Sequence, residues 1–255
     1  MGMEEFFNYI KSRCASEEEY VYEVIMARGF LLEENSFVLS DNSHKDDGAY
    51  LNELLKENNI GRLEGRKILI SSFSNIERIF DVNNYRNVTA SSITESWGEF
   101  AQKQYTPKVL LRILEPFVAR YIKAVSACGV LTWCSCDGNP PVSHGSRIAV
   151  DISEPSSRAW HRLLCEKYFK EGIKLNWNEE YSRIAFNKRT QWNTYIELNR
   201  AAEYLYKNRK KFREIKNKSF TGISSNQLKK LSKDEVEEFF RKAAGTLLDE
   251  YKISE

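Results

Sequence analysis

The sequence predicts an α+β protein: a four-stranded antiparallel sheet built from two repeated hairpin-plus-helix units, with additional N- and C-terminal helices. Segments 130–153 and 173–187 each hold two short apolar stretches typical of strands, and a helical pattern follows each segment. The second strands also agree almost residue for residue, Ser-Arg-Ile-Ala-Val at 146–150 against Ser-Arg-Ile-Ala-Phe at 182–186. Because two isolated hairpins would be marginally stable, we expect them to pair under shared helices. The alternative is a chance match between amphipathic strands.

The first region, residues 1–105, is predicted to be acidic and mainly helical, with one or two strands. Ser16 and Glu19 form a capping-box pattern that starts a helix, and Gly29 ends it. Further elements are predicted from apolar spacing: short helices over 3–13 and 49–59 and a strand over 67–73. The Asn-, Ser- and Thr-rich stretch 82–92 predicts an irregular connection and a domain boundary.

The second region, residues 106–220, is predicted to be the duplicated α+β domain. Thr106-Pro107 is typical of a helix start, and apolar side chains from Val109 to Val125 then hold one helical face. Pro116 within this pattern predicts a kink. The sheet units follow as strands 130–135 and 146–153, helix 156–169, strands 173–177 and 182–187, and a long helix opened by Thr190.

The third region, residues 221–255, is predicted to form one amphipathic helix behind the capping box Ser232–Glu235. Its apolar stripe must be covered by the domain or by another subunit, so a homo-oligomer through this helix is one expectation.

Composition excludes several classes of protein. The 255 residues are 42% hydrophobic, yet no stretch approaches the roughly 18 uncharged apolar residues of a membrane span. The acidic N-terminus does not resemble a secretory or transit signal. Five cysteines are too few for a disulfide scaffold, which predicts a reduced, cytoplasmic protein. Glycine-rich phosphate loops and the common hydrolase motifs are missing from the sequence.

Charge is distributed unevenly along the chain. Residues 1–60 hold 13 Asp or Glu against 5 Lys or Arg, whereas residues 200–218 hold 8 Lys or Arg against 2 Glu. The basic run could bind phosphates, face the acidic N-terminal region, or only face water. Tyr204, Tyr206 and Phe212 lie among the cations, where they could stack on bases or point into the core. The predicted ligand-binding residues of this run are Arg200, Lys207, Arg209, Lys210, Lys211 and Arg213.

A cysteine-rich segment, residues 128–141, is the other candidate site, and it allows three functional interpretations. A metal could be held by Cys128, Cys134, Cys136 and His144, although the spacing matches no common zinc motif. A nucleophilic Cys136 could pair with His144 or His161, with Asp137 or Asp151 orienting the base. A ligand loop would use Ser135, Cys136, Gly138 and Asn139. The cysteines could instead simply pack around a tight turn.

Ser135, Cys136 and Gly138, after a long helix, a glycine and a strand, resemble the Ser-Cys-Ser-Gly segment of the wybutosine-synthesis tRNA methyltransferases. Asp137 stands at the variable place, and Asn139 replaces the arginine typical of that family. The resemblance covers about a dozen residues. It implies S-adenosylmethionine near Ser135–Gly138 and an RNA partner for the basic helix.

These patterns together predict a binding protein for nucleic acid or a nucleotide-type anionic ligand. The basic helix and the cysteine-rich turn would carry the binding. An enzyme acting on RNA or a nucleotide, either methyltransferase-like or cysteine-dependent, is the first alternative. A homo-oligomeric interaction module is the second.

Overall fold

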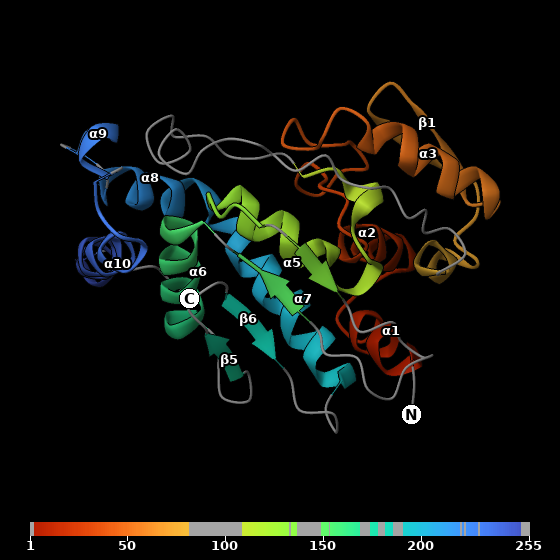
Figure 1. The fold of residues 1–255 in the computed structure, drawn as a ribbon. Helices are drawn as coiled ribbons and strands as arrows, with labels where there is room; N and C mark the ends of the chain where they lie inside the picture. Colours follow the sequence, from red (N-terminus) through yellow and green to blue (C-terminus); the bar gives the residue numbers. More distant parts are fainter. Residues whose placement is uncertain are drawn as a thin grey trace.

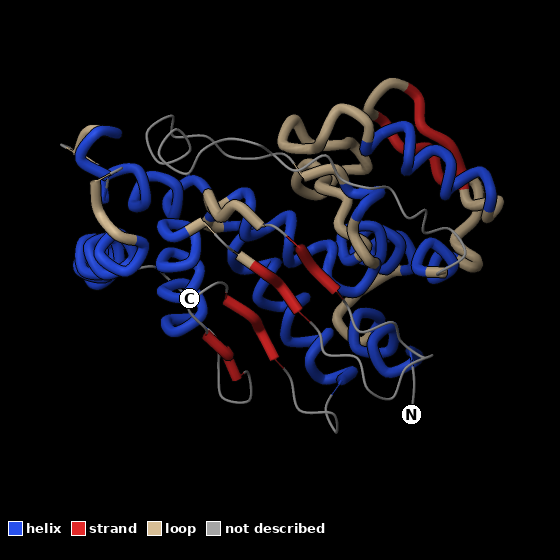
Figure 2. Tube along the Cα trace, viewed as in Figure 1, coloured by secondary structure: helices blue, strands red, loops and turns tan. Residues whose placement is uncertain are grey.

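The computed structural model describes residues 3–81, 109–132, 134–136, 149–152, 154–168, 174–177, 182–185, 191–219, 221, 223–228 and 230–250. Helices dominate this part of the chain (Figure 2). The α-helices are α1 (Met3–Lys11), α2 (Glu17–Ala27), α3 (Asp47–Glu57), α5 (Pro116–Ala127), α6 (Pro155–Tyr168), α7 (Gln191–Lys207), α8 (Arg209–Ser219), α9 (Ser225–Leu228) and α10 (Lys233–Glu250). Short 3-10 helices are η1 (Ile76–Phe80) and η3 (Leu111–Ile113). The strands are β1 (Gly61–Glu64), β2 (Lys67–Ile70), β3 (Cys134–Cys136), β4 (Ala149–Asp151), β5 (Lys174–Trp177) and β6 (Ser182–Ala185).

The predicted four-stranded sheet is wrong. Strands in the described ranges pair only as three separate antiparallel hairpins, β1–β2, β3–β4 and β5–β6. β4 and β6 lie side by side (Figure 1), but no backbone ladder joins them there. The helices that follow the two later hairpins also have different main neighbours, since α6 packs on α10 whereas α7 packs on α5 and α1. The two hairpin-plus-helix segments are therefore not equivalent halves beneath one common helical layer.

Helix α5 is the centre of the fold, and every one of its residues is buried. It begins at Pro116 rather than continuing through it, so the predicted kink is wrong. Glu115 has an extended backbone, as residues before proline usually do, and proline at the first helical position loses no hydrogen bond. The proposed start at Thr106-Pro107 lies outside the described residues, as does the stretch 82–92 with the proposed boundary near residue 105.

The N-terminal helices pack on α5 through a close approach and a buried ion pair. Gly29, just after α2, has a φ of 101°, and a Cβ there would lie 2.9 Å from Ala119 Cβ of α5. Lys123 Nζ of α5 and Asp47 Oδ2 of α3 are 2.5 Å apart, with side-chain exposures of 2% and 0%. Asp47 also accepts hydrogen bonds from the backbone N–H groups of His44 and Leu111. The capping prediction for α2 is confirmed, because the Ser16 hydroxyl accepts from the Glu19 backbone N–H.

The C-terminal helix α10 covers the opposite end of the molecule. Its stripe of Val236, Phe240, Ala244 and Leu248 is buried, and the helix packs on α6 and α8. The capping box at its start is confirmed by reciprocal hydrogen bonds between Ser232 and Glu235. The chain's own helices thus cover the apolar stripe. Among the helices that the structure describes, none has both the length and the apolar character needed to cross a membrane.

Candidate nucleic-acid interface

The basic run folds as two helices rather than the one predicted, because the chain turns at Asn208 between α7 and α8. The second helix, α8, is strongly two-sided. Phe212, Ile215 and Ser219 are buried, whereas Lys210 and Lys218 are exposed, as is Lys207 just before the turn. The apolar side chains recur at helical spacing, which places the intervening cations on the outer side. Lys211 and Arg213 are half-buried at the edges of that outer side.

Lys216 is the exception within the run, because it points into the core. Its ammonium group donates a hydrogen bond to the carbonyl oxygen of Gly129, just beyond the end of α5. Burial lowers the pKa of Lys216 to about 7, and the nearby Glu154 carboxylate opposes part of that shift. Lys216 therefore anchors α8 to α5 and is not positioned to meet a ligand.

Two of the predicted ligand residues, Arg209 and Arg200, interact with side chains or carbonyls of α7. Arg209 stacks over the Tyr206 ring, 4.0 Å from its centroid, and donates to the Tyr206 carbonyl oxygen at 2.7 Å. Arg200 forms an ion pair with Glu197 at 3.0 Å, one turn away on α7. The other four predicted residues, Lys207, Lys210, Lys211 and Arg213, lie on or next to the outer side of α8 together with Lys218, which forms an ion pair with Glu214. We call these five residues the cationic face.

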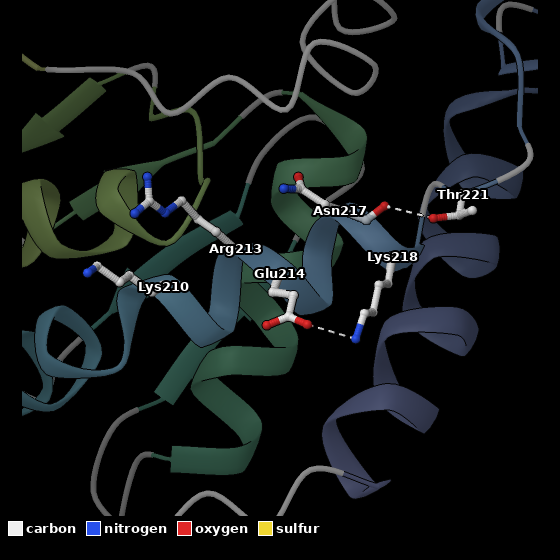
Figure 3. A pocket seen from close by; sticks show the side chains of 6 residues that line it. All are labelled: Lys210, Arg213, Glu214, Asn217, Lys218 and Thr221. Carbon is white, nitrogen blue, oxygen red and sulfur yellow. Dashed lines mark hydrogen bonds and ion pairs between the residues drawn. The ribbon is translucent and has the colours of Figure 1, made fainter.

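A surface hollow of about 430 Å³ lies along the outer side of α8 (Figure 3). It is lined by Lys210, Arg213, Glu214, Asn217, Lys218 and Thr221. Glu214 and Lys218 form an ion pair at 2.8 Å, and both side chains are about half exposed. The Thr221 hydroxyl donates to the Asn217 backbone carbonyl. The hollow thus combines three cations with a carboxylate, an amide and a hydroxyl, and its lining holds no apolar side chain.

The cationic face does not dock against the acidic N-terminal helices. Figure 1 places α8 at the end of the molecule away from α1, α2 and α3. Where α7 does contact α1, the ion pair has the opposite polarity to that expected, with Arg13 on the N-terminal side and Glu203 on α7 at 3.0 Å. Lys207 and Lys210 form no ion pair with any carboxylate in the described part of the chain. The cationic face is therefore separated from the acidic helices α1, α2 and α3, although α7 itself contacts α1.

The aromatic side chains of the basic run face inward. Phe212 is fully buried, and Tyr204 and Tyr206 pack against the core. Tyr206 also donates its hydroxyl to Ser40 Oγ at 3.3 Å. Of the two orientations that the sequence left open, the structure thus shows the inward one, and the cationic face has no aromatic platform for stacked bases.

The cysteine-rich segment is described only in part. Ser135 is half-buried in β3, and the side chains of Cys134, Cys136 and Asp151 are outside the described set. The whole residues Asp137, Gly138, Asn139 and His144 also lie outside it. The ligand-loop and nucleophile interpretations, and the resemblance to the wybutosine-synthesis methyltransferases, therefore stay predictions.

Cys128 is a residue of the buried core. Its thiol is fully buried and donates to the Leu205 carbonyl oxygen at 3.3 Å. Burial raises the pKa of this thiol far above its usual range, which keeps it protonated and unsuited to bind a metal as thiolate. Within the residues described, no group of three or more His, Cys, Asp or Glu side chains could hold a metal ion.

His161 lies in a buried cluster with Tyr121 and Cys165. Tyr121 Oη is 2.7 Å from His161 Nε2, and Cys165 Sγ is 3.5 Å from both atoms. All three side chains are at most 1% exposed. Burial lowers the pKa of His161 to about 3 and raises that of Cys165 to about 12, so both side chains are neutral near pH 7. The partner of His161 in the structure is thus Cys165 and not the predicted Cys136, and the four-residue spacing of His161 and Cys165 on one helix indicates this pairing.

The buried His161 predicts a loss of stability in mild acid. Its pKa is near 6.5 in an unfolded chain and about 3 in the folded one, so the unfolded state binds the proton first as the pH falls. The free energy of unfolding should therefore decrease below pH 6.5, by up to about 1.4 kcal/mol per pH unit from this residue. Urea denaturation of the wild type and His161→Gln between pH 7 and 5 measures this contribution. A wild-type profile as flat as that of the variant contradicts the assignment.

Three residues of the hollow, Glu214, Asn217 and Thr221, were not among the predicted site residues. Counting in steps of three and four from Lys210 would have found them on one helical face. Lys218 was counted within the basic run but was not selected as a ligand residue.

No family model, curated protein or solved structure matches this chain.

Proposed function

We propose that this protein binds nucleic acid through the cationic face, Lys207, Lys210, Lys211, Arg213 and Lys218. The observation that carries the proposal is the two-sidedness of α8. Its apolar side chains and Lys216 fix the helix to the core, while the other cations gather on the outer side, far from the acidic helices. A cluster of cations along one helix is the electrostatic footprint of a phosphate-binding surface.

The length of the face favours a polymer over a single phosphate group. Lys210 and Lys218 lie eight residues apart on α8, which corresponds to about 12 Å along the helix axis. In a B-form duplex each strand carries one phosphate for every ~3.4 Å of helix axis. Several phosphates of one nucleic acid can therefore lie along the face together, whereas a small phosphorylated molecule would contact only part of it.

The side chains on the outer side of α8 favour contacts to the sugar-phosphate backbone of a nucleic acid over stacking on its bases. The aromatic rings of the run are turned inward, and Lys and Arg side chains form the outer side. Contacts to phosphates position a protein on nucleic acid and carry no direct sequence information. We expect binding with little dependence on base sequence.

The salt dependence of binding tests the proposal. Fluorescence anisotropy with a labelled RNA or DNA oligonucleotide should give an affinity that falls steeply with salt. If four cations each neutralise one phosphate, the slope of log affinity against log salt should be about −3. An affinity that does not change with salt, or no binding at low salt, overturns the proposal. Equal competition by a free mononucleotide would point instead to a small-molecule site.

A further inference from the structure

The aromatic rings of the basic run are already used within the fold. The Phe212 ring lies against the rings of Trp160 and Tyr204, with centroid distances of 6.3 Å and 6.2 Å. Arg209 covers the Tyr206 ring at 4.0 Å from its centroid. A base that stacked on these rings would have to displace the contacts that they make. Since stacking on aromatic side chains is the usual means of holding a single strand, the basic run is poorly suited to that ligand.

The hollow beside α8 fits a sugar-phosphate backbone better than it fits a base. The six described side chains that line it are all charged or polar (Figure 3). Proteins that take a base out of its stack hold it against aromatic or apolar side chains. Side-chain amides such as that of Asn217, and the cations of Lys and Arg, are instead common partners of phosphate and sugar oxygens. The lining therefore favours a nucleic acid whose bases stay stacked.

The cations of α8 are held at fixed spacings, because the core holds the helix itself. Phe212 and Ile215 are fully buried, and Lys216 donates to the Gly129 carbonyl oxygen. A duplex is also stiff and regular, and it carries one negative charge for every ~1.7 Å of its axis. The stretch of about 12 Å along α8 thus faces about seven phosphates of a duplex, twice the number of one strand in the same geometry. A fixed row of cations gains most from the ligand with the denser and more regular charge.

We infer that the cationic face binds double-stranded nucleic acid by its sugar-phosphate backbone, with the bases left paired and stacked; this inference rests on the proposed function. The backbone lies along the hollow, where Lys210 and Arg213 contact phosphates and the Asn217 amide donates to a backbone oxygen. Lys207 and Lys211 extend the row of phosphate contacts. An isolated strand offers fewer phosphates, and its exposed bases find no ring of the basic run to stack on.

The first experiment compares a DNA duplex with each of its separated strands by fluorescence anisotropy across a salt series. If four cations each neutralise one phosphate, the slope of log affinity against log salt should be about −3.6 for the duplex and about −2.8 for a strand. At 0.1 M salt this difference corresponds to about sixfold tighter binding of the duplex. A fluorescent base analogue that brightens on unstacking, placed within the duplex, should keep its intensity when the protein binds.

Two variants locate the contact. Asn217→Asp places a carboxylate in the hollow and should weaken duplex binding about eightfold at 0.1 M salt, the loss of one phosphate contact. Asn8→Asp is the matched control, because it makes the same change at an exposed position of α1, far from α8, and it should bind the duplex as the wild type does.

A third variant tests for stacking. Phe239 is 37% exposed on α10, which packs on α8, so its ring could still meet a base. Phe239→Ala should leave the affinities for the duplex and for the strand unchanged. If the ring holds a base instead, the affinity for the strand falls about tenfold.

Several results would overturn the inference. A separated strand may bind as tightly as the duplex, the base analogue may brighten, or Phe239→Ala may lower the affinity for the strand. Equal duplex affinities of Asn217→Asp and Asn8→Asp would also overturn it. In each case nucleic-acid binding itself would stand. Failure of the proposed function is a different result, in which neither the duplex nor the strand binds. Circular dichroism of the three variants verifies that the helices are retained.

Discussion

A variant in which Lys207, Lys210, Lys211 and Arg213 are all replaced by glutamate is expected to lose about a thousandfold in nucleic-acid affinity at 0.1 M salt. Four phosphate contacts that each contribute about 0.7–0.9 log units per tenfold change in salt account for this loss. The added carboxylates repel the phosphate backbone of the nucleic acid, so the slope of log affinity against log salt should be close to zero. Fluorescence anisotropy across a salt series measures both quantities.

A matched control separates a specific face from general charge. Lys45, Lys56, Arg62 and Lys67 are exposed and belong to the N-terminal part, on or near α3 and its hairpin. Their replacement by glutamate changes the net charge of the protein by the same amount. This control should bind nucleic acid with an affinity within severalfold of the wild type. Equal losses in the two variants would show that net charge, and not the cationic face, attracts the ligand.

A large loss of stability is expected when the buried ion pair between Lys123 of α5 and Asp47 of α3 is broken. Lys123→Met leaves the Asp47 carboxylate, which is 0% exposed, without its cation. Removing one partner of a buried ion pair costs about 3–5 kcal/mol, because an uncompensated charge stays in a low-dielectric environment. The free energy of unfolding from urea denaturation should fall by that amount. Lys123 Nζ also donates to the Val109 carbonyl oxygen at 2.6 Å, and the loss of this bond acts in the same direction.

The double variant Lys123→Met/Asp47→Asn tests whether charge causes the loss. Asparagine carries no charge, and its one side-chain oxygen can still accept from the backbone N–H of either Leu111 or His44, which bind different oxygens of Asp47. The double variant should therefore recover a substantial part of the stability that Lys123→Met loses. A double variant at least as unstable as Lys123→Met would mean that packing, and not the unpaired carboxylate, dominates the loss.

Several elements could be predicted from local sequence because their causes are local. The Ser16 and Ser232 caps, and the end of α2 at Gly29, depend on side chains and dihedral angles within a few residues. The apolar stripes of α5 and α10 follow from helical spacing alone. Pro116 shows where a local rule allows two outcomes, since proline is compatible with a kink or with a helix start. In the structure Glu115 has an extended backbone, so the helix begins at Pro116.

The four-stranded sheet could not be judged from the sequence. Strands of three or four residues have weak signals, and the near-match of 146–150 with 182–186 contains no information about which edges pair. Pairing is a contact between distant segments, and in the described residues each strand pairs only with its hairpin neighbour. The helices that follow the two hairpins, α6 and α7, also pack on different helices, α10 and α5.

The candidate site also has one part that could be predicted from the sequence and one part that depends on long-range packing. Charge counting was sufficient to locate a basic run and to separate it in sequence from the acidic N-terminal region. Which cations face solvent depends on how α8 is rotated about its own axis, and the core sets that rotation through Phe212, Ile215 and the Gly129 carbonyl that binds Lys216. The hollow around Glu214 exists only after that rotation is fixed. Composition thus locates the charge, and long-range packing determines which of the charges a ligand can reach.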